Sequence, residues 1–247
     1  MNTEILYGLH PVNEALVSRR RGIHDLYLQK DPRSARIGRL AATAAQRGIG
    51  VKTVGPADLK KLTGVSGHQG AAARVDPLPT SAVSDILAAA ETRGEPPFLL
   101  ILDSILDPQN LGAIVRTALC AGIDGIIMPK DRSAPPTPAV SKASAGALEH
   151  ILLSRATNLV PAIQQCKKSG LWVAGLDKMA DQSIYDGDLT GAVAMVLGGE
   201  QKGIRPLVRK NCDFLVSIPQ KGALDSLNVS AAAAVAMYEA VRQRQKR

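Results

Sequence analysis

Two polar turns near the C-terminal end of the chain carry the residue types best suited to holding a small molecule. The first, Gly198-Gly199-Glu200-Gln201-Lys202-Gly203, follows the apolar run 192–197. The second, Ser226-Leu227-Asn228-Val229-Ser230, comes shortly after the strand-like run 214–219 and opens an alanine-rich helix. In open α/β sheets, ligands bind at the turns that follow the strands. We therefore expect these turns to form a backbone-lined site for a flat, polar small molecule.

Several familiar chemistries lack their sequence signature. The first turn has neither the GxGxxG spacing of dinucleotide-binding proteins nor the Lys-Ser/Thr of a P-loop, and the chain has no HExxH motif and no nucleophile elbow. The three cysteines, Cys120, Cys166 and Cys212, are far apart and form no CxxC pair. This pattern argues against a disulfide framework or a zinc site and favours a reducing cytoplasm. Hydride transfer, nucleoside triphosphate hydrolysis and triad hydrolysis are disfavoured, and no metal is expected.

The charge of the chain points to a polyanionic partner. The 247 residues carry a net charge of +8, and 45% of them are hydrophobic, which is enough for a substantial core. Residues 1–76 hold twelve Lys and Arg against six Asp and Glu. No apolar run approaches the roughly 20 residues of a membrane span, and the polar Asn2-Thr3-Glu4 does not resemble a signal peptide. We therefore expect no membrane partner. The excess of basic residues lies in the N-terminal part, so we expect that part to contact the polyanion.

The pattern of apolar residues predicts an α/β protein with two domains. Residues 1–76 form a small α/β unit, residues 77–95 a proline-bearing linker, and residues 96–247 a larger domain. The N-terminal unit is predicted to have helices at 12–18, 37–47 and 56–62 and strands at 25–29, 51–54 and 68–75. The larger domain is predicted to have strands at 98–102, 125–128, 171–176, 192–197 and 214–218 and helices at 111–121, 139–147, 159–169, 204–211 and 229–244. This alternation predicts a mostly parallel sheet with helices on both sides.

The N-terminal unit contains two groups of arginines. Arg19-Arg20-Arg21 ends a predicted helix, and Arg33, Arg36 and Arg39 lie around the start of the next. Taken singly, each arginine is best explained as a solvated surface residue. As a cluster on one small domain, they favour contact with nucleic-acid phosphates.

Three stretches, taken in order, resemble the three motifs of the SpoU/TrmH branch of the SPOUT methyltransferases. They are Asp107-Pro108-Gln109-Asn110-Leu111-Gly112-Ala113-Ile114-Val115-Arg116-Thr117-Ala118, then 197–204, then Ile218-Pro219 through Ser230. The likeness extends through 129–133 and 141–147 and into the N-terminal part at 7–11 and 68–70. Each motif alone is weakly specific, but together they are highly specific for the family.

The resemblance implies a fold and an activity. The fold is a SPOUT domain with a parallel sheet and a C-terminal trefoil knot, preceded by a small, ribosomal-protein-like RNA-binding domain. The activity is 2′-O-methylation of a guanosine ribose in large-subunit (23S) rRNA, with S-adenosylmethionine bound in the knot of a homodimer whose site uses both chains. Two alternatives remain open: ribose methylation of tRNA, and a non-catalytic RNA-binding factor in ribosome assembly.

The resemblance also assigns residues. Leu197, Gly198, Gly199, Ile218 and Leu227 match the positions that hold the methyl donor. Arg116 matches the catalytic arginine, for which orientation and electrostatic activation of the ribose hydroxyl is the expected role, because a guanidinium does not readily give up its proton. The further active-site positions are Asn110, Glu200, Ser226 and Asn228.

Each assignment has a structural alternative. The donor-binding residues could be ordinary turn and core residues, and Arg116 could be a structural arginine paired with a carboxylate. Asn110 and Asn228 sit where helix N-caps are expected, so capping is an alternative or additional role for both. Glu200 is expected to pair with Arg116 or a neighbouring donor, the alternative being a solvated loop residue.

Overall fold

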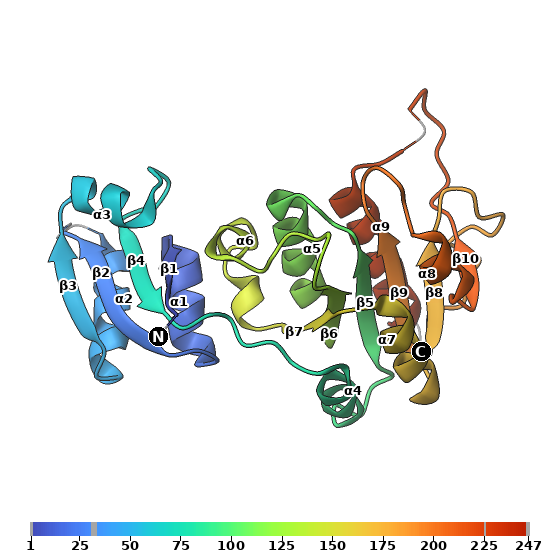
Figure 1. The fold of residues 1–247 in the computed structure, drawn as a ribbon, viewed down its shortest axis with the longest axis horizontal. Helices are drawn as coiled ribbons and strands as arrows, with labels where there is room; N and C mark the ends of the chain where they lie inside the picture. The colour runs from blue at the N-terminus through green and yellow to red at the C-terminus, as the bar shows by residue number, and fades with distance from the viewer. Residues whose placement is uncertain (1, 31–33, 225, 246–247) are drawn as a thin grey trace. The chain divides into compact units, whose positions relative to one another are not determined.

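The computed structural model describes residues 2–30, 34–224 and 226–245. The chain forms two compact units (Figure 1). Unit 1 comprises Met1–Pro79 together with Pro136–His150, and unit 2 comprises Thr80–Pro135 together with Ile151–Arg247. A short piece from the middle of the chain therefore packs with the N-terminal part.

Unit 1 is built on a four-stranded sheet with the order β1-β4-β2-β3. The strands are β1 (Glu4–Tyr7), β2 (Ile23–Gln29), β3 (Gly50–Val54) and β4 (Ala71–Val75), and the N-terminal helices are α1 (Leu9–Ser18), α2 (Ala35–Gln46) and α3 (Pro56–Thr63). β4 runs antiparallel to β1 and β2, whereas β2 and β3 are parallel. The core joins the buried side chains of the sheet to the apolar faces of α1 and α2.

Two features of this sheet differ from the prediction. β1 was not expected, and β4 begins at Ala71 rather than at residue 68. Gln69 and Gly70 have φ of 53° and 78°, which is left-handed backbone that cannot continue a strand. The ring nitrogen Nδ1 of His68 accepts a hydrogen bond from the backbone N–H of Gly70 at 3.1 Å, so a turn precedes the strand.

The segment 136–150 is the part of unit 1 that comes from the middle of the chain. It holds α6 (Pro138–Ala143) and a 3₁₀ turn, η1 (Ala147–Glu149), where the sequence predicted one helix over 139–147. The helix ends early because Ala145 and Gly146 have φ of 53° and 89°. A Cβ at Gly146 would lie 2.6 Å from Cγ of Glu14 on α1, so the turn packs closely against that helix.

A buried ion pair fixes this segment within unit 1. Arg21 Nε and Nη2 donate to the two carboxylate oxygens of Glu149 at 2.9 and 2.5 Å, and Ser141 Oγ donates to the same carboxylate at 2.7 Å. The Glu149 side chain has no exposed surface, and Arg21 also contacts Glu4. Arg21 is therefore a structural residue, and its predicted place in a phosphate-binding cluster is wrong. Arg33 of the second cluster lies outside the described residues.

Unit 2 contains a six-stranded parallel sheet with the order β10-β8-β9-β5-β6-β7. Its strands are β5 (Phe98–Asp103), β6 (Gly125–Pro129), β7 (Leu152–Ala156), β8 (Trp172–Leu176), β9 (Val193–Gly198) and β10 (Phe214–Val216). Its helices are α4 (Val83–Glu91), α5 (Pro108–Cys120), α7 (Leu159–Lys168), α8 (Pro206–Lys210) and α9 (Val229–Arg244). The predicted parallel α/β sheet is confirmed, with β7 as an additional edge strand.

Helices cover both faces of this sheet (Figure 1). Leu99 and Ile101 of β5 belong to a core cluster with residues of α4, α7 and α8. Leu100 and Leu102 are equally buried and point to the opposite face, because side chains alternate along a strand. On that face α5 and α9 pack against each other, and α9 also contacts β9. In the part of the chain that the structure describes, no helix is long and apolar enough to cross a membrane.

Candidate active site

A cleft of about 660 Å³ opens where β8 and β9 end. Its walls are drawn from residues 176–179, 197–204, 218–220 and 226–232. The structure thus brings the two polar turns together. Eight of the ten residues assigned to the site line this cleft, namely Leu197, Gly198, Gly199, Glu200, Ile218, Ser226, Leu227 and Asn228; Asn110 and Arg116 do not.

The first two of the three glycines in the first turn are required by close backbone packing. A Cβ on Gly198 would lie 2.0 Å from the carbonyl carbon of Gly203 and 2.2 Å from the nitrogen of Ile204. A Cβ on Gly199 would lie 2.2 Å from the carbonyl oxygen of Ser104. The loop closes on itself through a hydrogen bond from Gly203 N to Gly199 O at 3.1 Å. Without side chains at 198 and 199, this wall of the cleft is bare backbone.

A chain of side-chain hydrogen bonds joins three of the assigned residues. Asn228 Nδ2 donates to Asn110 Oδ1 at 3.1 Å, and Asn110 Nδ2 donates to Glu200 Oε1 at 2.8 Å. Asn228 Oδ1 accepts from Ser230 N at 2.9 Å and so caps α9. Because Oδ1 of Asn228 faces the helix, its amide must present Nδ2 to Asn110, which in turn aims its own Nδ2 at Glu200. The first turn, α5 and α9 are thereby held in a fixed relation.

The hydrogen bonds at the helix starts test the sequence-based predictions that Asn110 and Asn228 are N-caps. Capping by Asn228 is confirmed, whereas capping by Asn110 is wrong. Asp107 is the N-cap of α5, with its Oδ1 accepting from Gln109 N at 3.0 Å and Pro108 at the first helical position. The donor that Glu200 meets is Asn110 and not Arg116.

Among the residues that the structure describes, the side chains of Arg116 and Ser226 make no hydrogen bond or ion pair. Arg116 is exposed on α5, a helix whose buried face is made by Leu111, Gly112, Ile114, Val115 and Ala118. Within the described residues no carboxylate pairs with Arg116, so it is not the structural arginine of an ion pair. Ser226 is exposed on the wall of the cleft. Both side chains are accessible to a ligand or a second molecule.

Two carboxylates near the cleft were not singled out by sequence reasoning. Asp103, with no exposed surface, accepts from Arg205 N at 2.9 Å and Arg205 Nε at 2.7 Å. Asp177 lines the cleft and accepts from Met179 N at 2.9 Å and Arg209 Nε at 2.6 Å. Burial alone would raise the pKa of Asp177, but these bonds and the charge of Arg209 lower it overall. A signal did exist, because each aspartate directly follows a buried apolar run at a strand end.

The lining chemistry defines what the cleft can hold. Apolar side chains of Leu197, Ile218 and Leu227 suit a flat ring. The charged residues of the lining have both signs, namely Asp177 and Glu200 with Lys178 and Lys202. Within the described ranges no group of three or more His, Cys, Asp or Glu side chains is placed to hold a metal ion. The cleft thus fits an organic ligand that carries a flat ring and charged groups.

Comparisons with known proteins agree with this geometry. Residues 97–238 match the model of the SpoU rRNA Methylase family, and residues 5–81 match the RNA 2′-O ribose methyltransferase substrate binding model. The chain is 41% identical over 247 residues to the 23S rRNA (guanosine-2′-O-)-methyltransferase RlmB of Pseudomonas putida, covering 98% of this chain and 97% of the relative. It is 39% identical to RlmB of Vibrio cholerae, with 99% and 98% covered.

Solved structures show the same fold. The SpoU methyltransferase AviRb from Streptomyces viridochromogenes, in complex with AdoMet, superposes with a TM-score of 0.83 at 24% identity, covering 99% of this chain and 92% of that one. The AdoMet-bound rRNA methyltransferase from Sinorhizobium meliloti gives a TM-score of 0.80 at 26% identity, with 97% and 87% covered. With motifs, fold and full-length relatives in agreement, the chain belongs to the SpoU rRNA methylase family.

Proposed function

We propose that this protein transfers a methyl group from S-adenosylmethionine to the ribose 2′-oxygen of a guanosine in large-subunit rRNA. The observation that carries this proposal is the cleft in which the glycine turn 198–203 meets the asparagine turn 226–230. Beside it, hydrogen bonds join Asn228 to Asn110 and Asn110 to Glu200. Two 23S rRNA (guanosine-2′-O-)-methyltransferases that match nearly the full chain support the choice of substrate.

The cleft fits the methyl donor. S-adenosylmethionine, when bound, supplies an electrophilic methyl group on a sulfonium. The backbone at Gly198 and Gly199, with the side chains of Leu197, Ile218 and Leu227, forms a site for the adenosine part. The carboxylate of Asp177, kept ionised by its hydrogen bonds and by Arg209, favours the positive end of the molecule.

Arg116 is the residue proposed to act on the ribose hydroxyl. Its guanidinium donates hydrogen bonds and stabilises the negative charge that develops on the 2′-oxygen as the proton leaves to solvent. That charge is lost when the oxygen takes the methyl group, since the bond from the methyl group to sulfur breaks and the sulfonium would become a neutral thioether. Asn110, Glu200, Ser226 and Asn228 shape the surroundings of the reacting oxygen. Since Arg116 is exposed and does not line the cleft of its own chain, we propose a homodimer whose site draws on both chains.

The remaining parts complete the proposal. Unit 1, whose N-terminal part is the predicted domain 1–76, is proposed to hold rRNA by its phosphates and shape. Unit 2 is proposed as the catalytic domain; it includes α4, which lies in the predicted linker 77–95 and packs into the core of this unit. The matched substrate-binding model at 5–81 supports the first assignment. The C-terminal part is proposed to pass through a trefoil knot, and the protein to work in the cytoplasm without a metal. Light scattering of the purified chain tests the dimer.

The test of the mechanism is Arg116→Ala assayed with labelled donor on rRNA that lacks the modification. Methyl transfer is expected to be lost. Donor binding, measured by titration, stays within about twofold of the unchanged protein because Arg116 lies outside the donor cleft, and RNA binding stays within about twofold because the contact with the 2′-oxygen acts mainly in the transition state. Full activity of the variant would show that Arg116 has another role.

Mass-spectrometric mapping decides between rRNA and tRNA. Ribosomal and transfer RNA from cells that lack the protein are compared with RNA from cells that contain it. The proposal requires one ribose methylation to disappear from large-subunit rRNA and none from tRNA.

A further inference from the structure

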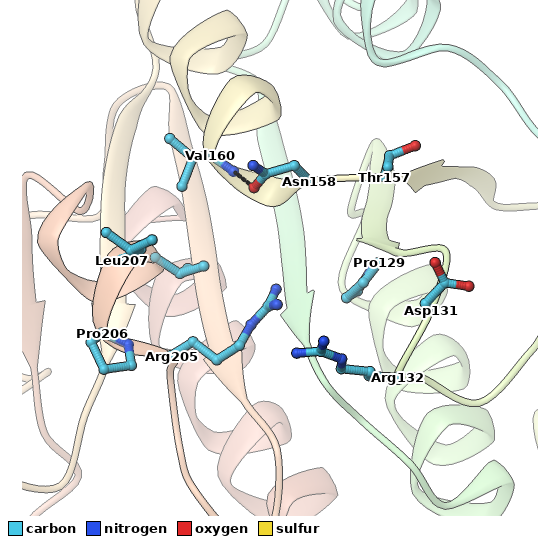
Figure 2. A pocket seen from close by; sticks show the side chains of 10 residues that line it. Pro129, Asp131, Arg132, Thr157, Asn158, Val160, Arg205, Pro206 and Leu207 are labelled. Atoms are coloured by element: carbon cyan, nitrogen blue, oxygen red, sulfur yellow. Dashed lines mark hydrogen bonds between the residues drawn. The ribbon is translucent and has the colours of Figure 1, made fainter.

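A second cavity of about 660 Å³ lies in unit 2, apart from the donor cleft. It opens at the carboxyl ends of β6 and β7, between the start of α7 and the residues that lead into α8 (Figure 2). Gly203 and Ile204 line the donor cleft, and the next two residues, Arg205 and Pro206, line this cavity. The two hollows are therefore neighbours on one edge of the sheet.

Two guanidinium groups are directed into the cavity from opposite walls. Arg205 enters from the segment before α8 and Arg132 from the loop after β6, and their planar ends point toward one another in Figure 2. Asp131, which also lines the cavity, carries its carboxylate away from both, and no ion pair joins it to either arginine in the described parts of the chain. Like charges that face each other across a hollow favour an anion between them.

Arg205 is held in this orientation by a buried partner. Nε and the backbone N–H of Arg205 donate hydrogen bonds to the carboxylate of Asp103 at 2.7 and 2.9 Å. Among the described residues, no hydrogen bond uses the two terminal nitrogens of Arg205, so both are available to a ligand. Arg132 is exposed and has no ion-pair partner within those same residues. The site combines one preorganised guanidinium with one adaptable guanidinium.

The rest of the wall is a mixture of apolar surface and one amide. Pro129, Val160 and Leu207 contribute apolar surface, and Leu207 is 69% exposed at the mouth. Asn158 caps α7, with its Oδ1 accepting from Val160 N at 3.0 Å. Its Nδ2 is left as a further donor. A ligand that carries both an anionic group and a flat, weakly polar ring matches this lining.

We propose that the cavity binds a nucleotide of the substrate RNA next to the methylated one. Its phosphate lies between Arg132 and Arg205, and its base lies against Pro129 and Leu207. The inference rests on the proposed function for the identity of the RNA. It adds a phosphate and base site in the catalytic unit to the contacts expected of the N-terminal domain, and it makes Arg132 and Arg205 positioning residues for the strand.

The test uses the full-length protein and unmodified transcripts of large-subunit rRNA fragments, with Kd measured by fluorescence anisotropy at several salt concentrations. Arg132→Gln removes the charge and keeps most of the stem. A lost charge-assisted contact raises Kd about tenfold at low salt, and one fewer neutralised phosphate makes the slope of log K against log salt shallower by about 0.7. Arg132→Lys keeps the charge and so keeps most of the slope.

Matched variants separate the site from a general charge effect. Lys168→Gln removes an exposed charge from the other end of α7, about 15 Å from its start, and is expected to leave both Kd and slope unchanged. Leu207→Ala is expected to raise Kd a few fold through lost apolar contact while the slope stays the same. Donor binding by every variant reports that unit 2 is folded. Arg205 is not substituted, because its loss would leave the buried Asp103 without its cationic partner.

The outcomes separate failure of the cavity proposal from failure of the proposed function. Unchanged affinity and slope in Arg132→Gln, or an equal loss in Lys168→Gln, overturns the inference, as does a wild-type protein that binds no rRNA fragment. A wild-type protein that methylates rRNA while Arg132→Gln binds normally refutes the cavity and leaves the proposed function standing. If the wild-type protein transfers no methyl group, but Arg132→Gln raises the Kd for RNA and makes the salt slope shallower, the proposed activity is refuted and the cavity stands as an RNA-binding site.

Discussion

Substitution of Gly198 by alanine is expected to damage donor binding through a backbone collision. The added Cβ would stand 2.0 Å from the carbonyl carbon of Gly203 and 2.2 Å from the nitrogen of Ile204, where ordinary contacts begin at 3.4 Å. Both neighbours are main-chain atoms, so no side chain can rotate away, and the loop must retreat by roughly 1.4 Å to restore an ordinary contact. Forced overpacking of this kind costs about 1–3 kcal/mol. If the cleft bears that cost, the Kd for the donor rises about 5- to 150-fold.

Two further glycines provide matched controls. Gly203→Ala meets no atom within 4 Å but must hold φ at 62°, which costs an L-residue about 1–2 kcal/mol. Gly191→Ala meets neither obstacle. The three variants make the same chemical change, so collision, backbone strain and a neutral site are compared directly.

The assay is calorimetric titration of S-adenosylmethionine, paired with urea unfolding of each variant. Gly198→Ala is expected to lose the most donor affinity. Gly203→Ala is expected to lose stability with a smaller loss of affinity, and Gly191→Ala to match the unchanged protein. Normal donor binding by Gly198→Ala, or a larger loss in Gly203→Ala, would refute the claim that close packing of the loop shapes the cleft.

Three other predictions follow from unit 1 and from the thiols. Glu149→Ala leaves the cation of Arg21 buried without its main partner, so the free energy of unfolding should fall by about 3–5 kcal/mol in urea titrations; a loss below about 1 kcal/mol would contradict the buried pair. Burial raises the pKa of the Cys166 and Cys212 thiols to about 11. At pH 8 a thiol reagent should therefore label only the exposed Cys120 in native protein and all three cysteines after unfolding. Hydrogen bonds from Lys52, first, and from Arg74 lower the pKa of Asp25. The ionised carboxylate therefore contributes its full stabilisation above the unfolded-state pKa near 4, and this contribution is lost as the pH falls through the lower folded-state pKa. In Asp25→Asn, the free energy of unfolding should consequently depend less on pH in the acid range.

The sequence predicted the interior of the large sheet better than its edges. Runs such as 98–102 and 192–197 are apolar at every position because helices cover both faces of the strands they form. β7 escaped prediction because Ser154 and Arg155 interrupt its apolar run at the edge of the sheet. β1 is only four residues long and pairs on one side. The order of strands depends on pairings such as Phe98 with Val193, which no local pattern encodes.

The candidate site was predictable as residue types and unpredictable as contacts. The motifs indicated Asn110, Glu200 and Asn228, but their hydrogen-bonded order depends on chain segments that meet only in the folded unit. The capping error at Asn110 was avoidable, because Asp107-Pro108 is the typical start of a helix with proline at its first position. Arg21 illustrates the opposite case, since only the fold shows that one arginine of a basic run pairs with a buried glutamate from a distant segment.

Asp103 links the two hollows of unit 2 in one structural argument. It ends β5, its side chain has no exposed surface, and its two oxygens hold the backbone and the guanidinium of Arg205. The backbone bond fixes the end of the 203–205 segment, against which Gly198 packs at one side of the donor cleft. The guanidinium bond directs the same residue into the second cavity. A buried carboxylate is costly unless it is fully paired, so the arrangement keeps both bonds together, and the shape of the donor cleft and the position of the proposed phosphate contact depend on the same side chain.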